Sequence, residues 1–106
     1  MVDKDKILSD ETLRTVALEL MYDNPQKWQT AEGPTAIEIA RRHNFKTDIV
    51  KKKLKLLQDK GLVRVINFRP KIWKFDEFNF NDMDVNDPLC LLITRYDDDD
   101  YEKYYF

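Results

Sequence analysis

The hydrophobic residues of this chain change their spacing at Gly61. Before this glycine, three of them recur at i, i+4 and i+7, which is the spacing of one face of an α-helix: Val50, Leu54 and Leu57. A helix over residues 47–60 gathers all three on a single apolar stripe, and that stripe requires a core to cover it. Gly61 tolerates the left-handed backbone with which helices commonly end. The pattern therefore predicts an amphipathic helix that ends at a C-cap glycine.

The residues after Gly61 have the composition of β-strands. Residues 62–66 and 72–75 are short runs rich in β-branched and aromatic side chains. The residues between them, 67–71, include Pro70, which cannot donate a ladder hydrogen bond and is typical of a turn. The sequence therefore predicts a β-hairpin directly after the helix, and hence an α+β fold.

Two further helices are expected earlier in the chain. Ser9 has the character of an N-cap, and the apolar residues that follow it recur at helical spacing over residues 10–22. The residues before Ser9 alternate in charge and are expected to be frayed. A second helix begins at Thr35, because Thr35 and Glu38 have the spacing of a capping box. It ends near Asn44, one of the few residues besides glycine that tolerates a left-handed conformation.

The composition of the chain changes after residue 75. We therefore divide it into a domain over residues 1–75 and an acidic C-terminal extension over residues 76–106. Asp87 and the proline after it favour the start of a fourth helix over residues 89–96. The same stretch is also compatible with a strand over residues 89–94, and of the two we favour the helix.

Length and composition exclude several classes of protein. A chain of 106 residues is about one domain. Its single cysteine, Cys90, rules out an internal disulfide framework and a cysteine-based zinc site. With two glycines, one serine and one histidine, the sequence contains neither a glycine-rich phosphate loop nor a nucleophile with its base. We therefore expect no enzyme activity, no catalytic residue and no cofactor.

Metal and membrane sites are not expected either. Residues 82–86 match the opening of a calcium-binding loop, but Asp87 replaces the required glycine and Ile93 replaces the final glutamate. The longest uncharged apolar run, residues 89–93, is too short to cross a bilayer. The first residues have no basic-then-apolar pattern, so secretion is not expected. The expected location is the cytoplasm.

The net charge of −2 hides a strong asymmetry along the chain. Residues 1–75 contain 16 lysines and arginines against 10 acids, a net of +6, whereas residues 76–106 contain 2 against 10, a net of −8. The positive charge is itself concentrated, because residues 41–74 contain 12 basic residues and 2 acids. Such asymmetry points to nucleic acid, to an acidic partner, or to an acidic tail that controls a basic surface.

The order of helix, helix, short turn, helix, glycine and basic hairpin resembles a winged helix-turn-helix domain. The resemblance covers residues 9–75 and is strongest in three segments: 35–40, the turn 43–45, and 54–63, which looks like the corresponding part of bacterial regulators of the MarR and ArsR types. It implies a three-helix core with a β-hairpin wing, followed here by an extra helix or strand and the acidic tail. It also implies that the chain forms a homodimer.

The resemblance further implies how duplex DNA would be bound. The helix over residues 47–60 would lie in the major groove, and the wing at 67–71 would contact backbone or minor groove. At about 100° per residue, Lys51, Lys52 and Lys55 fall on the face of this helix that is turned away from its apolar stripe. The residues expected to contact DNA are Arg41, Arg42, Lys46, Thr47, Lys51, Lys52, Lys55, Arg69 and Lys71.

The expected function is therefore sequence-specific or general binding of duplex DNA by a transcriptional regulator. The alternative is a winged-helix module that binds another protein and has no direct contact with DNA. The acidic tail has three open roles: competition with DNA for the basic surface, recruitment of a protein partner, or dimerisation. His43 is expected to be a structural histidine, and Trp28 and Trp73 are expected to be core or interface aromatics.

Overall fold

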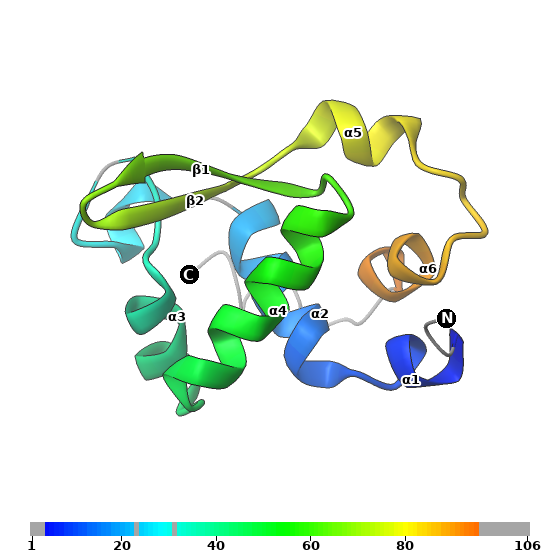
Figure 1. Cartoon of the computed structure of the whole chain (residues 1–106), viewed down its shortest axis with the longest axis horizontal. Coiled ribbons are helices and arrows are strands. Elements are labelled where there is room, and N and C mark those ends of the chain that lie inside the picture. The colour runs from blue at the N-terminus through cyan, green and yellow to red at the C-terminus, as the bar shows by residue number, and fades with distance from the viewer. Residues whose placement is uncertain (1–3, 23, 31, 96–106) are drawn as a thin grey trace.

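The computed structural model describes residues 4–22, 24–30 and 32–95. These residues form a small α+β fold in which helices pack around a two-stranded antiparallel sheet (Figure 1). The helices before the sheet are α1 (Lys4–Leu8), α2 (Glu11–Met21), the 3₁₀ turn η1 (Pro25–Lys27), α3 (Ala36–His43) and α4 (Thr47–Asp59). The sheet consists of β1 (Val63–Phe68) and β2 (Lys71–Phe75), and it is followed by α5 (Glu77–Asp82) and α6 (Pro88–Thr94).

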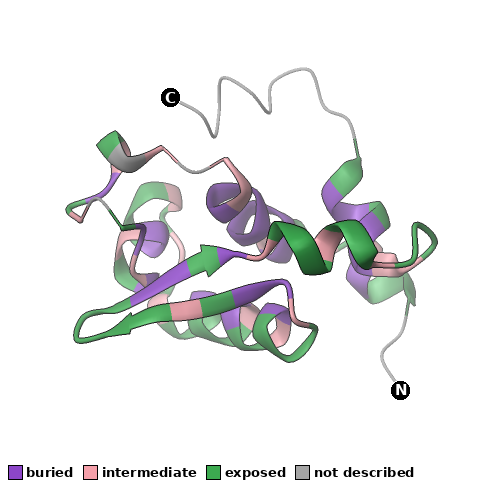
Figure 2. Ribbon diagram, turned by 90° about the horizontal axis from the view of Figure 1, so that it is seen from above, coloured by how far each residue is buried: buried purple, intermediate pink, exposed green. Residues whose placement is uncertain are grey.

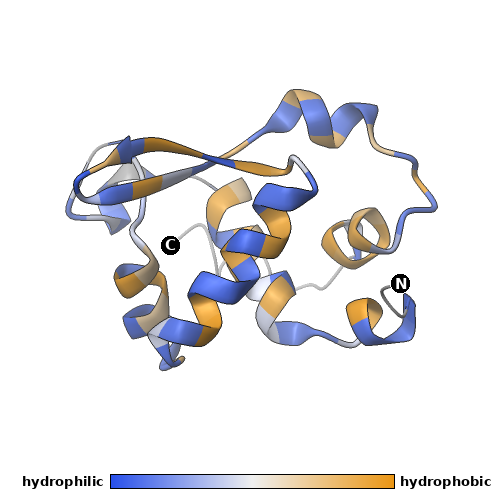
Figure 3. Ribbon diagram, in the orientation of Figure 1, coloured by the Kyte–Doolittle hydropathy of each residue, from blue (hydrophilic) through white to orange (hydrophobic). Residues whose placement is uncertain are grey.

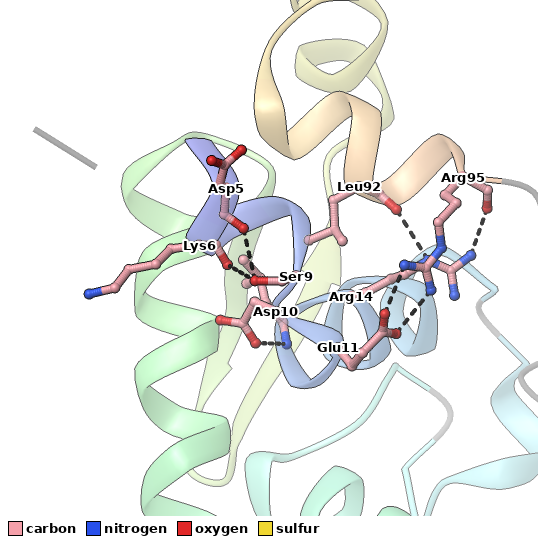
Figure 4. Close-up of polar contacts among 9 residues, drawn as sticks. Asp5, Lys6, Ser9, Asp10, Glu11, Arg14, Leu92 and Arg95 are labelled. Carbon is pink, nitrogen blue, oxygen red and sulfur yellow. Dashed lines mark hydrogen bonds and ion pairs between the residues drawn. The ribbon is translucent and has the colours of Figure 1, made fainter. Parts of the chain in front are cut away.

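The N-terminal segment differs from the expectation of a frayed end. Residues 4–8 form α1, whose Ile7 is buried in the core. The N-cap of α2 is Asp10 rather than Ser9, because the Asp10 carboxylate accepts a hydrogen bond from the Leu13 amide at 2.9 Å. The hydroxyl of Ser9 instead donates to the Asp5 carbonyl at 2.8 Å, at the end of α1 (Figure 4). Ser9 therefore satisfies the end of one helix and Asp10 the start of the next.

The predictions for α3 and α4 are confirmed. Thr35 and Glu38 form both hydrogen bonds of the capping box, and Asn44 adopts the left-handed conformation with a φ of 58°. The apolar stripe of α4 is fully buried: Val50, Leu54 and Leu57 each have 0% exposure. Gly61 follows α4 with a φ of +77°, a conformation that side chains rarely adopt.

The hairpin is also present, with longer strands than the sequence predicted. Its register pairs Val63 with Phe75 and Phe68 with Lys71, so the predicted turn at 67–71 narrows to Arg69 and Pro70. The side-chain amide of Asn67 donates to the Pro70 carbonyl at 2.8 Å across this turn. One face of the hairpin covers α2 and α4, whereas the tip of the turn is exposed (Figures 1 and 2).

The segment after the hairpin forms two helices, of which the sequence predicted one. The short helix α5 was not expected, since its mostly polar residues form no apolar stripe. Asp76 caps α5 by accepting from the Asn79 amide at 3.0 Å, and the Asn79 side chain donates to the Gly61 carbonyl at 2.9 Å. Phe80 packs beside Phe75, with ring centroids 5.4 Å apart. These contacts with the end of the hairpin hold a helix that has no buried residue of its own.

The second of these helices, α6, confirms that the stretch is helical rather than a strand, although the helix predicted over residues 89–96 ends at Thr94 and residue 96 lies outside the described residues. Asp87 accepts from the Leu89 amide at 2.9 Å and Pro88 occupies the first turn. α6 packs against α1 and α2 and consists almost entirely of apolar residues (Figure 3). Its buried side chains include Leu89, Leu92, Ile93 and Cys90. The extension therefore contributes to the core as far as α6, and the tail at 96–106 lies outside the described residues.

A buried arginine ties α6 to α2. Arg14 is 2% exposed, and its guanidinium donates to the Leu92 carbonyl at 3.1 Å and to the Arg95 carbonyl at 2.7 Å (Figure 4). The guanidinium of Arg95 in turn forms a bidentate ion pair with the Glu11 carboxylate, at 2.7 and 2.9 Å. The guanidinium of Arg14 thus satisfies carbonyls at the end of α6 that no helical amide reaches.

Candidate nucleic-acid interface

A groove of about 620 Å³ lies between α3, α4, the hairpin and the loop before α3, and four of the nine residues predicted to contact DNA line it. Four cationic residues line it: Arg41 from α3, Lys51 and Lys55 from α4, and Lys71 from β2. We call this feature the basic groove. It brings together side chains from three separate elements, which lie up to 30 positions apart in the sequence.

The lining of the basic groove contains one carboxylate, and that carboxylate is already engaged. Glu38 accepts from the Gln29 amide at 2.9 Å and from the Thr35 amide and hydroxyl at 3.3 Å. Lys55 forms an exposed pair with Asp59 at 3.0 Å, one turn further along α4. Such an exposed pair contributes little and exchanges readily with other anions. Positive charge therefore dominates the groove.

The groove also has an apolar side. Ala36, Ile37, Pro70 and Trp73 contribute to its lining, and Ile37 is 47% exposed. The ammonium of Lys71 lies 5.5 Å from the centroid of the Trp73 ring, a cation–π contact that holds Lys71 beside the strand. Trp73 itself is buried, as expected from the sequence.

Four of the other predicted contact residues lie at the start of α4, on α4 and in the hairpin turn. Lys46 is the exposed N-cap residue of α4, Thr47 is its half-buried first residue, and Lys52 is exposed on the same helix. Arg69 lies in the exposed turn of the hairpin. None of these four residues lines the groove. The neighbouring Lys53 does not line it either, and its ammonium pairs with the Asp10 carboxylate at 2.7 Å.

Arg42 points to a different site from its neighbour Arg41. Its Nε donates to the Glu19 carboxylate at 3.0 Å, and Glu19 is fully buried in α2. The same carboxylate lies 3.2 Å from Lys27 Nζ and 2.7 Å from His43 Nε2. We call these four residues, Glu19, Lys27, Arg42 and His43, the Glu19 cluster. His43 thus has the structural role that the sequence predicted.

The Glu19 cluster keeps its carboxylate ionised. Burial raises the pKa of Glu19, but the hydrogen bond to His43 and the charges of Lys27, His43 and Arg42 together lower that pKa below its ordinary value. Sequence reasoning missed this site. The signal available was a single glutamate between Leu18 and Leu20, in a helix whose other residues at 16–20 are all apolar.

Three further features concern metal binding, membrane insertion and Trp28. Within the described ranges, no group of three or more histidine, cysteine, aspartate or glutamate side chains lies close enough to hold a metal ion. In the same part of the chain, no helix has the length and hydropathy needed to span a membrane. Trp28 is buried in the core.

Comparison of the chain with protein families, with curated proteins and with solved structures found no match.

Proposed function

We propose that this protein is a winged helix-turn-helix protein that binds duplex DNA as a transcriptional regulator. In this proposal α3 and α4 form the helix-turn-helix, α4 lies in the major groove of the DNA, and the β1–β2 hairpin is the wing. The observation that carries the proposal is the convergence of Arg41, Lys51, Lys55 and Lys71 from three elements on one groove.

Electrostatics supports this proposal. Phosphates bind lysine and arginine side chains through charge, without the fixed geometry that a base edge requires. The cations in and beside the basic groove outnumber the carboxylates, and the carboxylate in the groove lining is hydrogen-bonded to its own loop. Apart from Thr47, the predicted contact residues are all lysines and arginines, whose charges suit phosphate contact and whose donors can also reach guanine.

The proposal predicts strongly salt-dependent binding. If four to six cations meet phosphate, the logarithm of the affinity falls against the logarithm of the salt concentration with a slope of about −4 to −5. Fluorescence anisotropy with a labelled random duplex of about 20 base pairs, across a salt series, measures this slope. A chain that fails to bind at low salt would refute the proposal.

A second candidate is a docking module for an acidic protein segment. The observation in its favour is the apolar side of the basic groove, where Ile37 and Trp73 meet the cations. A peptide with alternating acidic and apolar side chains would match that combination, whereas duplex DNA would leave Ile37 without an apolar partner. Weak duplex binding together with tight peptide binding would favour this candidate over the first.

A further inference from the structure

The tip of the hairpin presents a large aromatic side chain to solvent. Phe68 is the last residue of β1 and is 75% exposed. It pairs in register with Lys71, which lines the basic groove, and Arg69 and Pro70 close the turn between them. The bond from the Asn67 side chain to the Pro70 carbonyl braces this turn. Phe68 is therefore held beside cations at the outer end of the hairpin.

The charge around Phe68 selects the kind of surface it can meet. The hairpin and the glycine before it, residues 61–75, contain four basic residues and no acid. A second exposed phenylalanine, Phe78 of α5, is 84% exposed but lies among acidic residues, with Asp76 and Glu77 before it and Asp82 after it. A polyanion would therefore attract the surroundings of Phe68 and repel those of Phe78.

We infer that Phe68 is a wedge that inserts between two stacked base pairs when the hairpin enters the minor groove. Proteins that bind the minor groove combine arginine or lysine with an apolar side chain of this kind, which partly unstacks one step and bends the duplex by about 20–90°. Arg69 and Lys71 hold the phosphates on either side, and the Phe68 ring occupies the opened step. This inference rests on the proposed DNA binding and adds to it a deformation of the DNA.

Deformation of this kind gives preference for certain sequences without base contacts. Pyrimidine–purine steps unstack most easily, so a wedge favours sites that contain them at the position of the tip. This route to preference requires no base contact from α4. The energy of unstacking offsets most of the contact energy of the ring, so the affinity of the Phe68→Ala variant falls by no more than about tenfold.

Ring closure of short DNA tests the inference with the full chain. A duplex of about 100 base pairs is shorter than the persistence length of about 150 base pairs, so ligase closes it into a circle slowly unless a protein bends it. The full-length protein should accelerate closure several-fold. Phe68→Ala should lose this acceleration at matched DNA occupancy, and Phe68→Trp should keep it. Phe78→Ala is the matched control and should behave as the unchanged protein.

The possible results separate the wedge from the binding itself. Binding with a steep salt slope but without accelerated closure, or equal acceleration by Phe68→Ala, overturns the wedge and leaves DNA binding intact. Absence of binding by the unchanged protein at low salt overturns both. A thermal melt of each variant checks the fold, which an exposed side chain at a hairpin tip should not affect.

Discussion

Cations gather in two regions of this protein, the Glu19 cluster and the basic groove. In the Glu19 cluster, Lys27, Arg42 and His43 surround one buried carboxylate at 2.7–3.2 Å. In the basic groove, four cations from α3, α4 and β2 line an open cavity, and the carboxylate in the lining is hydrogen-bonded to Gln29 and Thr35. The first arrangement is complete without a ligand, whereas the second leaves positive charge available for one. We therefore expect changes in the cluster to alter stability and changes in the groove to alter binding.

Removing the carboxylate charge of Glu19 should lower the stability of the protein more than any other change considered. In Glu19→Gln, Lys27 loses the Glu19 carboxylate while its side chain remains 2% exposed, and breaking a buried ion pair by removing one partner costs about 3–5 kcal/mol. Since about 4–8 °C is lost per kcal/mol in a domain of this size, calorimetry should show a fall in Tm of about 12 °C or more. A Tm within about 2 °C of the unchanged protein would contradict the role assigned to the cluster.

Removing the guanidinium of the buried Arg14 should cause the second largest loss of stability. Arg14→Met keeps the unbranched apolar stem of the side chain but leaves the carbonyls of Leu92 and Arg95 without the guanidinium donor, at a cost of about 2–3 kcal/mol. Arg95→Met is the control, because its pair with Glu11 is exposed and such pairs contribute about 0–1 kcal/mol. Urea unfolding monitored by tryptophan fluorescence compares the two. Equal losses would mean that Arg14 does not anchor α6.

Acid should weaken the Glu19 cluster next. Since the pKa of Glu19 is lowered in the folded protein, its contribution to the free energy of unfolding is complete above the ordinary pKa of a glutamate, about 4.3. It is lost as the pH falls through the lowered value of the folded state. Urea unfolding from pH 7 to pH 3 should therefore show a decline that is smaller in Glu19→Gln. The same decline in both proteins would contradict the assignment.

The smallest effect concerns Lys53 of α4, which pairs with Asp10 and does not line the basic groove. Lys53→Ala removes a partly buried pair with Asp10 and should cost about 1 kcal/mol or less. Because Lys53 turns to Asp10, the salt slope of DNA binding should not change. A lower slope in this variant would mean that Lys53 leaves Asp10 to contact phosphate, and would contradict the exclusion of Lys53 from the DNA-binding cations.

The sequence predicted those helices whose stabilising residues lie close together in the chain. The stripe of Val50, Leu54 and Leu57, the capping box at Thr35 and the left-handed Asn44 each depend on residues within one or two turns. The helices α1 and α5 have no comparable stripe, and distant contacts hold them: Ile7 enters the core, and the Asn79 side chain bonds to Gly61. The sequence contained no local reason to expect either helix.

The candidate site shows the same division. Arg41 and Arg42 were both predicted to contact DNA, because a sequence shows the charge of a side chain but not the residue with which that charge pairs. Arg41 and Arg42 lie side by side, yet one lines the basic groove and the other meets Glu19 from α2. Among the lysines of α4, Lys51 lines the groove, whereas Lys53, which was not predicted to contact DNA, pairs with Asp10. In both cases a residue more than 20 positions away decides the outcome. The homodimer implied by the resemblance stays a prediction.

The central claim is that the cations of the basic groove bind duplex DNA, and one pair of variants tests it most directly. Lys51→Ala with Lys55→Ala removes two charges from the groove, while Lys4→Ala with Lys6→Ala removes two from exposed positions on α1. With about 0.9 counterions released per phosphate contact, the groove variant should reduce the salt slope by about 2. The α1 variant should leave the slope unchanged. Equal slopes in the two variants, measured by fluorescence anisotropy on the same duplex, would contradict the claim.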